Sequence, residues 1–257
     1  MANLRLLSWN VNGIRAIQKK GFLGWLEKES PDILCLQETK AHVEQLTKEL
    51  INPNGYETYW SSGEKKGYSG VALYTKAEPK KTETGFDIKK YDSEGRILIT
   101  DYDDFILFNI YFPNGQRDQE RLNYKLGFYD EFLRYVNDLK DKGRKIIICG
   151  DVNTAHKEID LARPRENQNT SGFLPIERKW MDKFFECGYI DTFRHFVKDG
   201  GHYTYWDPVS RARERNVGWR IDYFIISPNL LKNLKSAFIL PDVMGSDHCP
   251  LGIEIDI

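Results

Sequence analysis

Cysteine is scarce in this chain, with four residues spread over the whole sequence: Cys35, Cys149, Cys187 and Cys249. No CxxC pair and no Cys/His ligand spacing occurs, so neither a zinc site nor a disulfide scaffold is indicated. Cys35 and Cys149 sit in apolar runs, where free thiols are commonly buried. We therefore expect the cysteines to contribute to packing rather than to chemistry.

Long hydrophobic runs are absent as well. The first residues, MANLRLLSWN, lack the apolar core of a signal peptide. No apolar run approaches the roughly 20 residues that a membrane-spanning helix needs. We therefore expect an intracellular protein, cytoplasmic or, in a eukaryote, nuclear, without a membrane partner. No obligate protein partner is evident, and we expect a monomer.

Charge of one sign is not in excess, because 37 Lys and Arg stand against 38 Asp and Glu, a formal net charge of −1. A strongly basic chain would point to nucleic acid, but net charge averages over faces and leaves a local basic surface open. The 257 residues are 40% hydrophobic, enough for a sizeable core. We expect one domain over residues 1–257.

Short apolar runs alternate with helical patterns along the chain. The apolar rhythm and the position of Pro175 predict helices at about 13–28, 117–141 and 175–185. The region 56–112 has hairpin-like spacing, which predicts an antiparallel meander. Strands are expected at 4–9, 32–37, 71–75, 97–100, 105–111, 145–149, 219–227, 237–240 and 251–255. This order predicts a four-layer α/β sandwich, with two mostly antiparallel sheets packed together and helices outside.

Several strands end in an acid or an amide, as at Asn10, Glu38 and Asp151. Polar groups at strand ends can converge at one rim of a sheet, where ligand sites commonly lie. Carboxylate and amide oxygens with one histidine and no cysteine suit magnesium better than zinc. The residues of this kind are Asn10, Asn12, Glu38, Asp151, Asn153, Asp222, Asp247 and His248.

Each of these residues also has a purely structural interpretation, because Asp or Asn after a strand is often a turn or helix-cap residue. Asp222 differs, since it interrupts the apolar run WRI-D-YFIIS, where an unpaired carboxylate is costly to bury. His248 is a plausible partner, and an Asp–His pair would orient the imidazole and favour its charged form. A lone histidine would more often be structural.

A basic stretch with an aromatic residue follows at 211–220, RARERNVGWR. A solvated loop is the usual role of such a stretch. For nucleic acid, Arg211 and Arg213 would bind phosphates and Trp219 would offer a stacking surface. The turn PNGQR at 113–117 similarly has phosphate-binding residue types near it, in Asn114 and Arg117.

Eight segments in order resemble the exonuclease III family of apurinic/apyrimidinic (AP) endonucleases, in the deoxyribonuclease-I-like, or endonuclease/exonuclease/phosphatase, superfamily. They are LLSWNVNGIRA (6–16), DILCLQETK (32–40), NIYFPNG (109–115), ICGDVNTAH (148–156), EIDLARP (158–164), SGFLPIER (171–178), NVGWRIDYF (216–224) and MGSDHCP (244–250). Only the region 56–105 carries little of this signature.

The resemblance implies roles for individual residues. The metal ligands would be Glu38, Asn10 and Asp247. Asp151 would activate the attacking water, and Asn153, Tyr111 and His248, held by Asp222, would contact the phosphate. Contacts to the DNA backbone or phosphate would come from Asn12, Lys40, Asn114, Arg117, Arg211 and Arg213. Tyr205, Trp219 and Ile221 would form the pocket for a flipped-out abasic sugar.

The implied activity is Mg²⁺-dependent hydrolysis of duplex DNA on the 5′ side of an abasic site, leaving a 3′-hydroxyl and a 5′-deoxyribose phosphate, with Mn²⁺ as a possible substitute. We also expect 3′-exonuclease or 3′-phosphodiesterase activity. Incision beside damaged or deaminated bases such as deoxyuridine stays open, because Tyr205 brings a hydroxyl into the pocket that a Phe would not.

Two alternatives remain at this stage. One is a phosphatase or phosphodiesterase of the same superfamily acting on an inositol phosphate or a phospholipid. The segment GWRIDYF and the basic stretch argue against it. The other is a non-catalytic module that binds damaged DNA, against which the complete polar set Glu38, Asp151, Asn153, Asp222, Asp247 and His248 argues.

Overall fold

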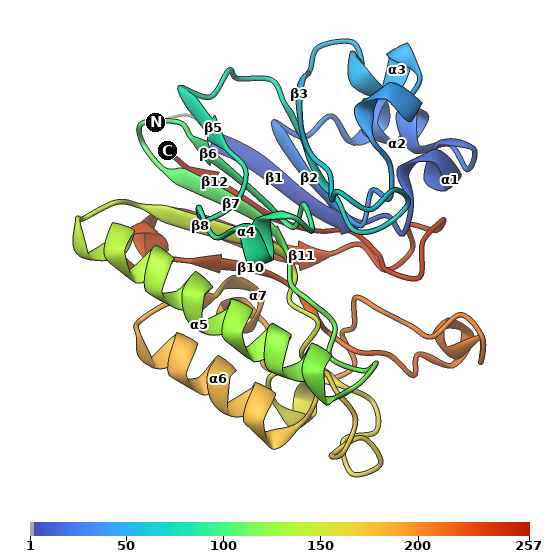
Figure 1. Cartoon of the computed structure of the whole chain (residues 1–257), viewed down its shortest axis with the longest axis vertical. Helices are drawn as coiled ribbons and strands as arrows, with labels where there is room; N and C mark the ends of the chain where they lie inside the picture. Colours follow the sequence, from blue (N-terminus) through green and yellow to red (C-terminus); the bar gives the residue numbers. More distant parts are fainter. Residues whose placement is uncertain (1–2) are drawn as a thin grey trace.

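Two six-stranded sheets pack face to face in the computed structural model, which describes residues 3–257 (Figure 1). The first sheet has the order β11 (Leu234–Ile239), β12 (Leu251–Asp256), β1 (Asn3–Asn10), β2 (Ile33–Gln37), β4 (Val71–Thr75) and β3 (Glu57–Ser61). The second has the order β5 (Lys81–Glu83), β6 (Ile97–Asp101), β7 (Ile106–Tyr111), β8 (Ile146–Asp151), β10 (Asp222–Ile226) and β9 (Ile190–Asp191). The β1–β2 and β7–β8 pairs are parallel, whereas the other named pairs are antiparallel.

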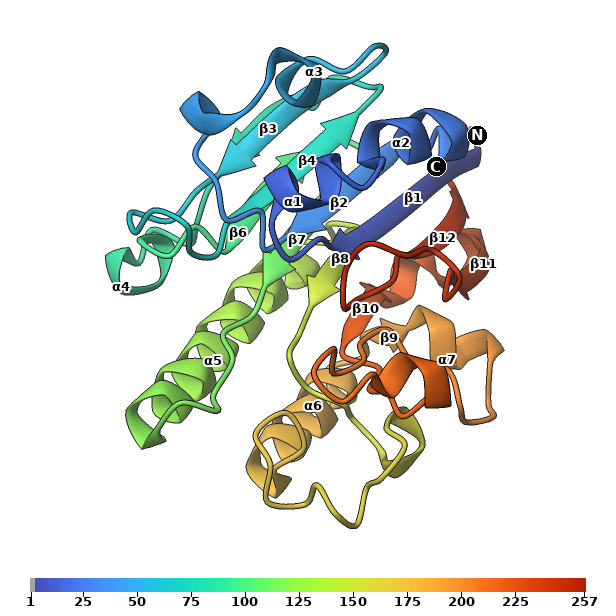
Figure 2. The ribbon, with the colours of Figure 1, turned by 90° about the vertical axis from the view of Figure 1, so that its right-hand side faces the viewer.

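Helices cover the outer faces of both sheets, and in Figure 2 the two groups lie on opposite sides of the strands. Outside the first sheet are α1 (Ile14–Gln18), α2 (Phe22–Glu29) and α3 (Lys48–Ile51). Outside the second are α5 (Gln119–Asp141) and α6 (Pro175–Glu186). Shorter elements are α4 (Lys89–Asp92), α7 (Thr192–Phe196) and the 3₁₀ turns η1 (Val43–Gln45), η2 (Glu158–Asp160), η3 (Ala212–Arg215) and η4 (Pro228–Asn233). This arrangement confirms the predicted four-layer sandwich.

The sequence of β8 shows why the central strands have apolar residues at successive positions. Ile146 and Ile148 face the layer shared with α5 and α6, while Ile147 and Cys149 face the layer between the sheets. A strand buried on both faces needs apolar side chains at every position. At Gly150, where φ is +135°, a Cβ would lie 1.9 Å from the Ile110 carbonyl oxygen. Only glycine therefore lets β8 run close beside β7 and end in Asp151.

The structure differs from the predicted elements in three places. The helix predicted over 13–28 is two helices, because the chain turns at Gly21, where φ is +93°. The meander predicted over 56–112 is divided: β3 and β4 pair in the first sheet, and β5, β6 and β7 pair in the second. The strand predicted from Trp219 begins only at Asp222, because Trp219 forms isolated bridges with Tyr205 and Leu161 instead.

No helix in the described residues 3–257 is long and apolar enough to cross a membrane.

Candidate active site

Polar ends of strands from both sheets meet at one end of the sandwich. Asn10 ends β1 of the first sheet, and Asp151 ends β8 of the second. The Asn10 amide Nδ2 donates to Asp151 Oδ2 at 2.9 Å, across the boundary between the sheets. Asp222 begins β10 directly opposite Asp151 in the antiparallel register. All three side chains are buried.

A buried ion pair lies beside Asp151. The His248 imidazole Nδ1 donates to Asp222 Oδ2 at 2.8 Å. Burial by itself would lower the pKa of His248, but the Asp222 carboxylate outweighs it and raises that pKa to about 10. Burial, and then repulsion from Asp222, raise the pKa of the Asp151 carboxyl to about 7. Near neutral pH the imidazole therefore holds a proton, while Asp151 can accept or release one.

Asn153 is held next to Asp151 by its own backbone and side chain. Its N–H donates to Asp151 Oδ1 at 2.8 Å. Its amide Nδ2 donates to the Phe112 carbonyl oxygen at 2.9 Å, and its Oδ1 accepts from Asn114 Nδ2 at 3.2 Å. The Phe112 carbonyl and the Asn114 amide bind the nitrogen and the oxygen of the Asn153 side chain, so its amide has one orientation.

A second polar group lies across the same opening. The Asn12 amide Nδ2 donates to Asp247 Oδ1 at 3.0 Å, and its Oδ1 accepts from the Lys40 ammonium. Lys40 Nζ lies 3.2 Å from Glu38 Oε1. Burial, and then the Glu38 carboxylate, raise the pKa of the Tyr111 hydroxyl. That hydroxyl therefore stays protonated and able to donate at neutral pH.

These groups line one cavity of about 230 Å³. One part of its wall is polar, and the other is the apolar surface formed by Tyr205, Trp219 and Ile221, which we call the aromatic wall. The Tyr205 ring also lies 4.9 Å from the His248 ring, measured between centroids. The cavity is lined by Asn12, Glu38, Lys40, Tyr111, Asn114, Gln116, Asp151, Asn153, Ser171, Gly172, Tyr205, Trp219, Ile221, Asp247 and His248.

Backbone in the left-handed region is concentrated here. Asn12, Glu38, Lys40 and Asn153 have φ values of 45°, 55°, 52° and 55°, and they are four of the ten described non-glycine residues with positive φ. Such conformations cost free energy and persist only where the surroundings impose them, which is typical of functional sites. For Glu38 and Lys40 the cost is greater than for asparagine, which tolerates this region.

The donor atoms fit a divalent metal ion. Ligand atoms of Asp151, Asp222 and His248 lie within 4.8 Å of one another and could hold an ion, but only if His248 first lost the proton that its pair with Asp222 favours. Within the described residues, Asp222 Oδ1 is buried without a hydrogen-bond partner. Glu38 and Asp247 add carboxylates to the same cavity. An oxygen-rich set without cysteine suits a hard cation.

The structure leaves several of the sequence-predicted residues outside the cavity wall. Asn10 and Asp222 lie behind it, bonded to Asp151 and His248. Arg117 is exposed and bonds to its neighbour Asp118, and Arg211 is exposed at the start of η3. Arg213 donates to the carbonyl oxygens of a nearby loop, at 2.8 Å for Val243 and 3.3 Å for Ser246. Its guanidinium therefore fixes this loop.

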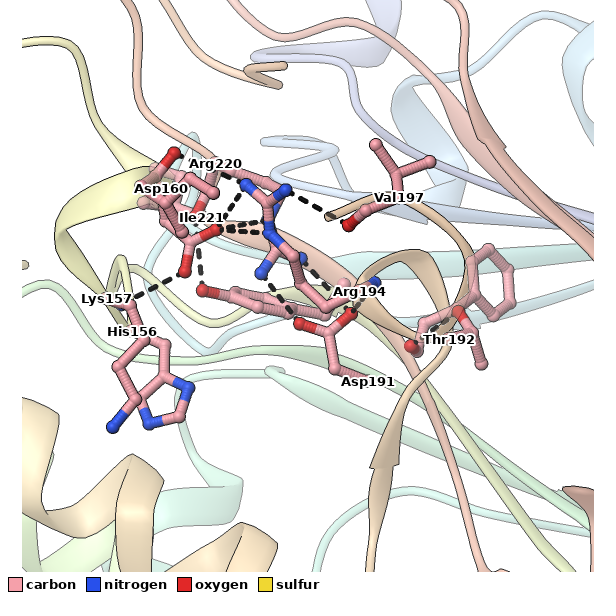
Figure 3. A network of polar contacts seen from close by, with 12 residues as sticks. His156, Lys157, Asp160, Asp191, Thr192, Arg194, Val197, Arg220 and Ile221 are labelled. Atoms are coloured by element: carbon pink, nitrogen blue, oxygen red, sulfur yellow. Dashed lines mark hydrogen bonds and ion pairs between the residues drawn. The ribbon is translucent and has the colours of Figure 1, made fainter. Parts of the chain in front are cut away.

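A buried network that sequence reasoning missed supports the aromatic wall (Figure 3). Arg220 lies between Trp219 and Ile221 and points away from the cavity, with its Nε 2.8 Å from Asp160 Oδ1 and its Nη2 2.6 Å from Asp191 Oδ2. Arg194 Nη2 adds a second bond to Asp160 Oδ1 at 2.8 Å. These bonds fix the backbone from which the two pocket residues project. The segments EIDLARP and GWRID contain Asp160 and Arg220, but their spacing does not reveal that they meet.

Comparisons with known proteins identify the family of this chain. The model of the Endonuclease/Exonuclease/phosphatase family matches residues 7–248. An exodeoxyribonuclease of Bacillus subtilis is 42% identical over 256 residues, covering 99% of this chain and 100% of that one. A DNA-(apurinic or apyrimidinic site) endonuclease of Dictyostelium discoideum is 42% identical over 258 residues, covering 99% of this chain and 71% of that one.

A solved structure gives the same result. The AP endonuclease from Archaeoglobus fulgidus superposes with a TM-score of 0.90 at 30% identity, covering 99% of this chain and 100% of that one. The family match over most of the chain and the full-length relatives lead to one assignment. The chain belongs to the Endonuclease/Exonuclease/phosphatase family and, within it, to the exonuclease III-type hydrolases.

Proposed function

We propose that this protein is a DNA-repair phosphodiesterase that incises duplex DNA hydrolytically on the 5′ side of an abasic site. The products would be a 3′-hydroxyl and a 5′-deoxyribose phosphate. The observation that carries the proposal is the single cavity in which the Asp151 and His248 groups share a wall with Tyr205, Trp219 and Ile221. A phosphodiester held at the polar part would leave its sugar against the aromatic part.

The proposed mechanism assigns one step to each polar residue. Asp151, whose pKa lies near 7, takes the proton of the attacking water, whose oxygen bonds to phosphorus while the P–O3′ bond breaks and the departing 3′-oxygen takes a proton from solvent. His248, protonated and oriented by Asp222, donates to a phosphate oxygen. The Asn153 amide and the Tyr111 hydroxyl contact the same phosphate as its charge develops. Donors fixed in advance are worth most in such a site, because they need no reorganisation during the reaction.

Magnesium is the proposed cofactor, with manganese able to replace it. Glu38 and Asp247 would hold the ion with Asn10, whose Oδ1 already accepts one bond from the Asn12 N–H. A metal ion held there would supply positive charge to neutralise the phosphate and to help the departing oxygen. Glu38 and Asp247 line the cavity together with Lys40, which also contributes positive charge, and Asn10 lies directly behind the wall.

Double-stranded DNA is the proposed partner. Asn12, Lys40 and Asn114 line the opening and would bind backbone phosphates, which position the duplex. The exposed guanidinium groups of Arg117 and Arg211 could extend this contact, and Arg213 would act by holding the loop at Val243.

The aromatic wall would select the nucleotide. Extruding a nucleotide without a base costs less unstacking free energy, so an abasic sugar enters most easily. Removal of 3′-terminal groups would use the same polar residues. Burial, and then the Asp247 carboxylate, raise the pKa of Tyr205 to about 12, so its hydroxyl stays protonated and could donate to a base edge. This supports deoxyuridine as a further substrate to test.

The test uses a duplex with one tetrahydrofuran abasic analogue, which cannot undergo β-elimination, in magnesium or in EDTA. Metal-dependent incision on the 5′ side, lost in Asp151→Asn, is the expected result. A second duplex with deoxyuridine, compared in wild type and Tyr205→Phe, measures substrate range; we expect Tyr205→Phe to lower the deoxyuridine-to-analogue ratio. Binding of the duplex without incision would overturn the proposed activity in favour of a damaged-DNA-binding module.

A further inference from the structure

A lysine without solvent exposure lies directly behind the catalytic loop. Lys125, on α5, is fully buried. Its ammonium donates to the Asn153 carbonyl oxygen at 2.8 Å, to Thr154 Oγ1 at 3.0 Å and to Glu177 Oε1 at 2.6 Å. These bonds use all three of its N–H groups. Burial lowers the pKa of Lys125, although Glu177 opposes the shift.

Its partner Glu177, in the first turn of α6, is also fully buried and has no free oxygen. Oε1 accepts from the Ser171 hydroxyl at 2.8 Å as well as from Lys125. Oε2 accepts from the N–H groups of Gly172 at 2.6 Å and Leu174 at 3.0 Å. The Glu177 carboxylate thus binds groups along the whole turn at 171–174 that leads into α6.

The two ends of this pair reach different parts of the cavity wall. At one end is Asn153, whose left-handed backbone the Lys125 bond holds from the carbonyl side. At the other end is Gly172, where a Cβ would lie 3.3 Å from both the Trp219 ring and the Asn153 carbonyl oxygen. The Gly172 carbonyl in turn accepts from the Ala155 N–H at 2.8 Å. The pair therefore ties the phosphate-contacting residue to the aromatic wall.

Stability alone gives no reason for a charged pair at this position. Apolar side chains of similar volume are often as stable as a buried ion pair, or more so. They could not, however, bind a backbone carbonyl, two backbone N–H groups and two hydroxyls at once. Only the charged pair can make these five contacts together.

We infer that Lys125 and Glu177 are positioning residues for catalysis, which set the distance between the Asn153 amide and the Gly172–Trp219 wall. The inference rests on the proposed function. A displacement of about 1 Å at a reacting centre can cost about 100-fold in rate. The pair should therefore act on the chemical step through Asn153, with little effect on substrate binding.

The test is a double-mutant cycle in the incision assay, with kcat and KM measured separately. Lys125→Met combined with Glu177→Gln removes both charges while keeping side-chain volume. We expect kcat to fall by about 10- to 100-fold and KM to change by less than about threefold. In an Asn153→Ala background, the same pair of substitutions should lower kcat by less than about threefold, because the residue it positions is gone.

The matched control is Lys140→Met, on the same helix. Lys140 also reaches a backbone carbonyl from α5, that of Cys187 at 2.7 Å, but it does not line the cavity. Its kcat should equal that of the wild type. A thermal unfolding curve for each variant shows whether it is folded at the assay temperature.

Three results would overturn the inference. One is a folded Lys125→Met, Glu177→Gln variant with wild-type kcat, and another is an equal loss in the Asn153→Ala background. Should the double variant not fold, Ser171→Ala removes one bond to Glu177 and keeps the ion pair. The kcat of Ser171→Ala should fall at least threefold when Asn153 is present and should not fall further in the Asn153→Ala background. An unchanged kcat when Asn153 is present is the third result that would overturn the inference. A wild type that does not incise would instead refute the proposed function itself.

Discussion

Asp151 is subject to opposing influences from its neighbours. Burial and the adjacent Asp222 carboxylate favour its protonated form. The positive charge of His248 and the bond from the Asn153 N–H favour the ionised form. The sum of these influences raises the pKa of Asp151 to about 7. The carboxylate is then a stronger base than that of an ordinary aspartate, and at pH 7 it is still ionised in about half of the molecules.

The pH dependence of incision follows from this residue and from His248. Asp151 must have lost its proton to accept one from water, so kcat/KM should rise as pH increases through about 7. His248 must keep its proton, so kcat/KM should fall near pH 10. Steady-state rates on the abasic-analogue duplex from pH 5 to 10.5 measure both limbs. An Asp151→Asn variant whose residual rate still rose through pH 7 would assign that limb to another group.

Individual site residues differed in how far sequence could predict their positions. Asp151, Asn153 and His248 line the cavity, and each follows a short apolar run or stands in a distinctive motif. Lys125 gave no such signal, because a lysine in an amphipathic helix is normally assigned to the solvent face. Glu177 stands in the segment SGFLPIER, but nothing in that segment shows that its side chain is buried. Their burial depends on how α5 and α6 approach the loop at Asn153, which no local pattern encodes.

At the scale of elements, Asp160 joins η2 to the segment before β10. Burial opposes ionisation, but Arg220 and Arg194 outweigh it and lower the pKa of the Asp160 carboxyl. Its folded-state pKa is thus below the unfolded value of about 3.9. The stabilisation is present above that pH and is lost as pH falls through the folded-state value. Urea unfolding between pH 2.5 and 7 should show the free energy of unfolding falling below about pH 4, with a shallower fall in Asp160→Asn.

A substitution at Gly150 would test how closely β7 and β8 must pair. Alanine there would place a Cβ 1.9 Å from the Ile110 carbonyl oxygen in a left-handed backbone, so Gly150→Ala should lower the free energy of unfolding by about 2–4 kcal/mol. Incision should also fall, because Asp151 is the next residue. Gly24→Ala is the control: it lies in α2, with no atom within 4 Å of the added Cβ. Chemical denaturation should find it unchanged or stabilised by about 0.5–1 kcal/mol.

Most elements could be predicted because their causes are local. The apolar run of β8 and the N-terminal proline of α6 are readable from a few residues. The division of β4 and β6 between the two sheets could not be predicted, because both runs have the same hairpin-like spacing. Which partner each strand takes is decided by packing against distant segments, and the same holds for Trp219, which pairs with Tyr205 before β10 begins.

For the molecule as a whole, the carboxylates at the cavity link metal binding to stability. Glu38, Asp151 and Asp247 share one cavity, so a bound cation would relieve their repulsion in the folded state. Magnesium at ten times its dissociation constant should raise the free energy of unfolding by about 1.4 kcal/mol. The melting temperature should rise by about 3–6 °C, and EDTA should reverse the change.

Thermal unfolding of Glu38→Gln provides the comparison. Its shift with magnesium should be less than half that of the wild type, because a carboxylate ligand is missing. An equal shift in both proteins would mean that the ion binds without Glu38.

The bond between Asn10 and Asp151 belongs to neither sheet alone, and the same is true of the bond between His248, in the loop before β12, and Asp222, at the start of β10. If one sheet slid past the other by a small part of the roughly 3.3 Å rise of a strand residue, these contacts would break while the ladder within each sheet stayed intact. Far-ultraviolet circular dichroism would not detect such a slip. An incision assay would detect it, because the site residues would no longer be aligned. On gentle heating this enzyme should therefore lose activity at a lower temperature than it loses secondary structure.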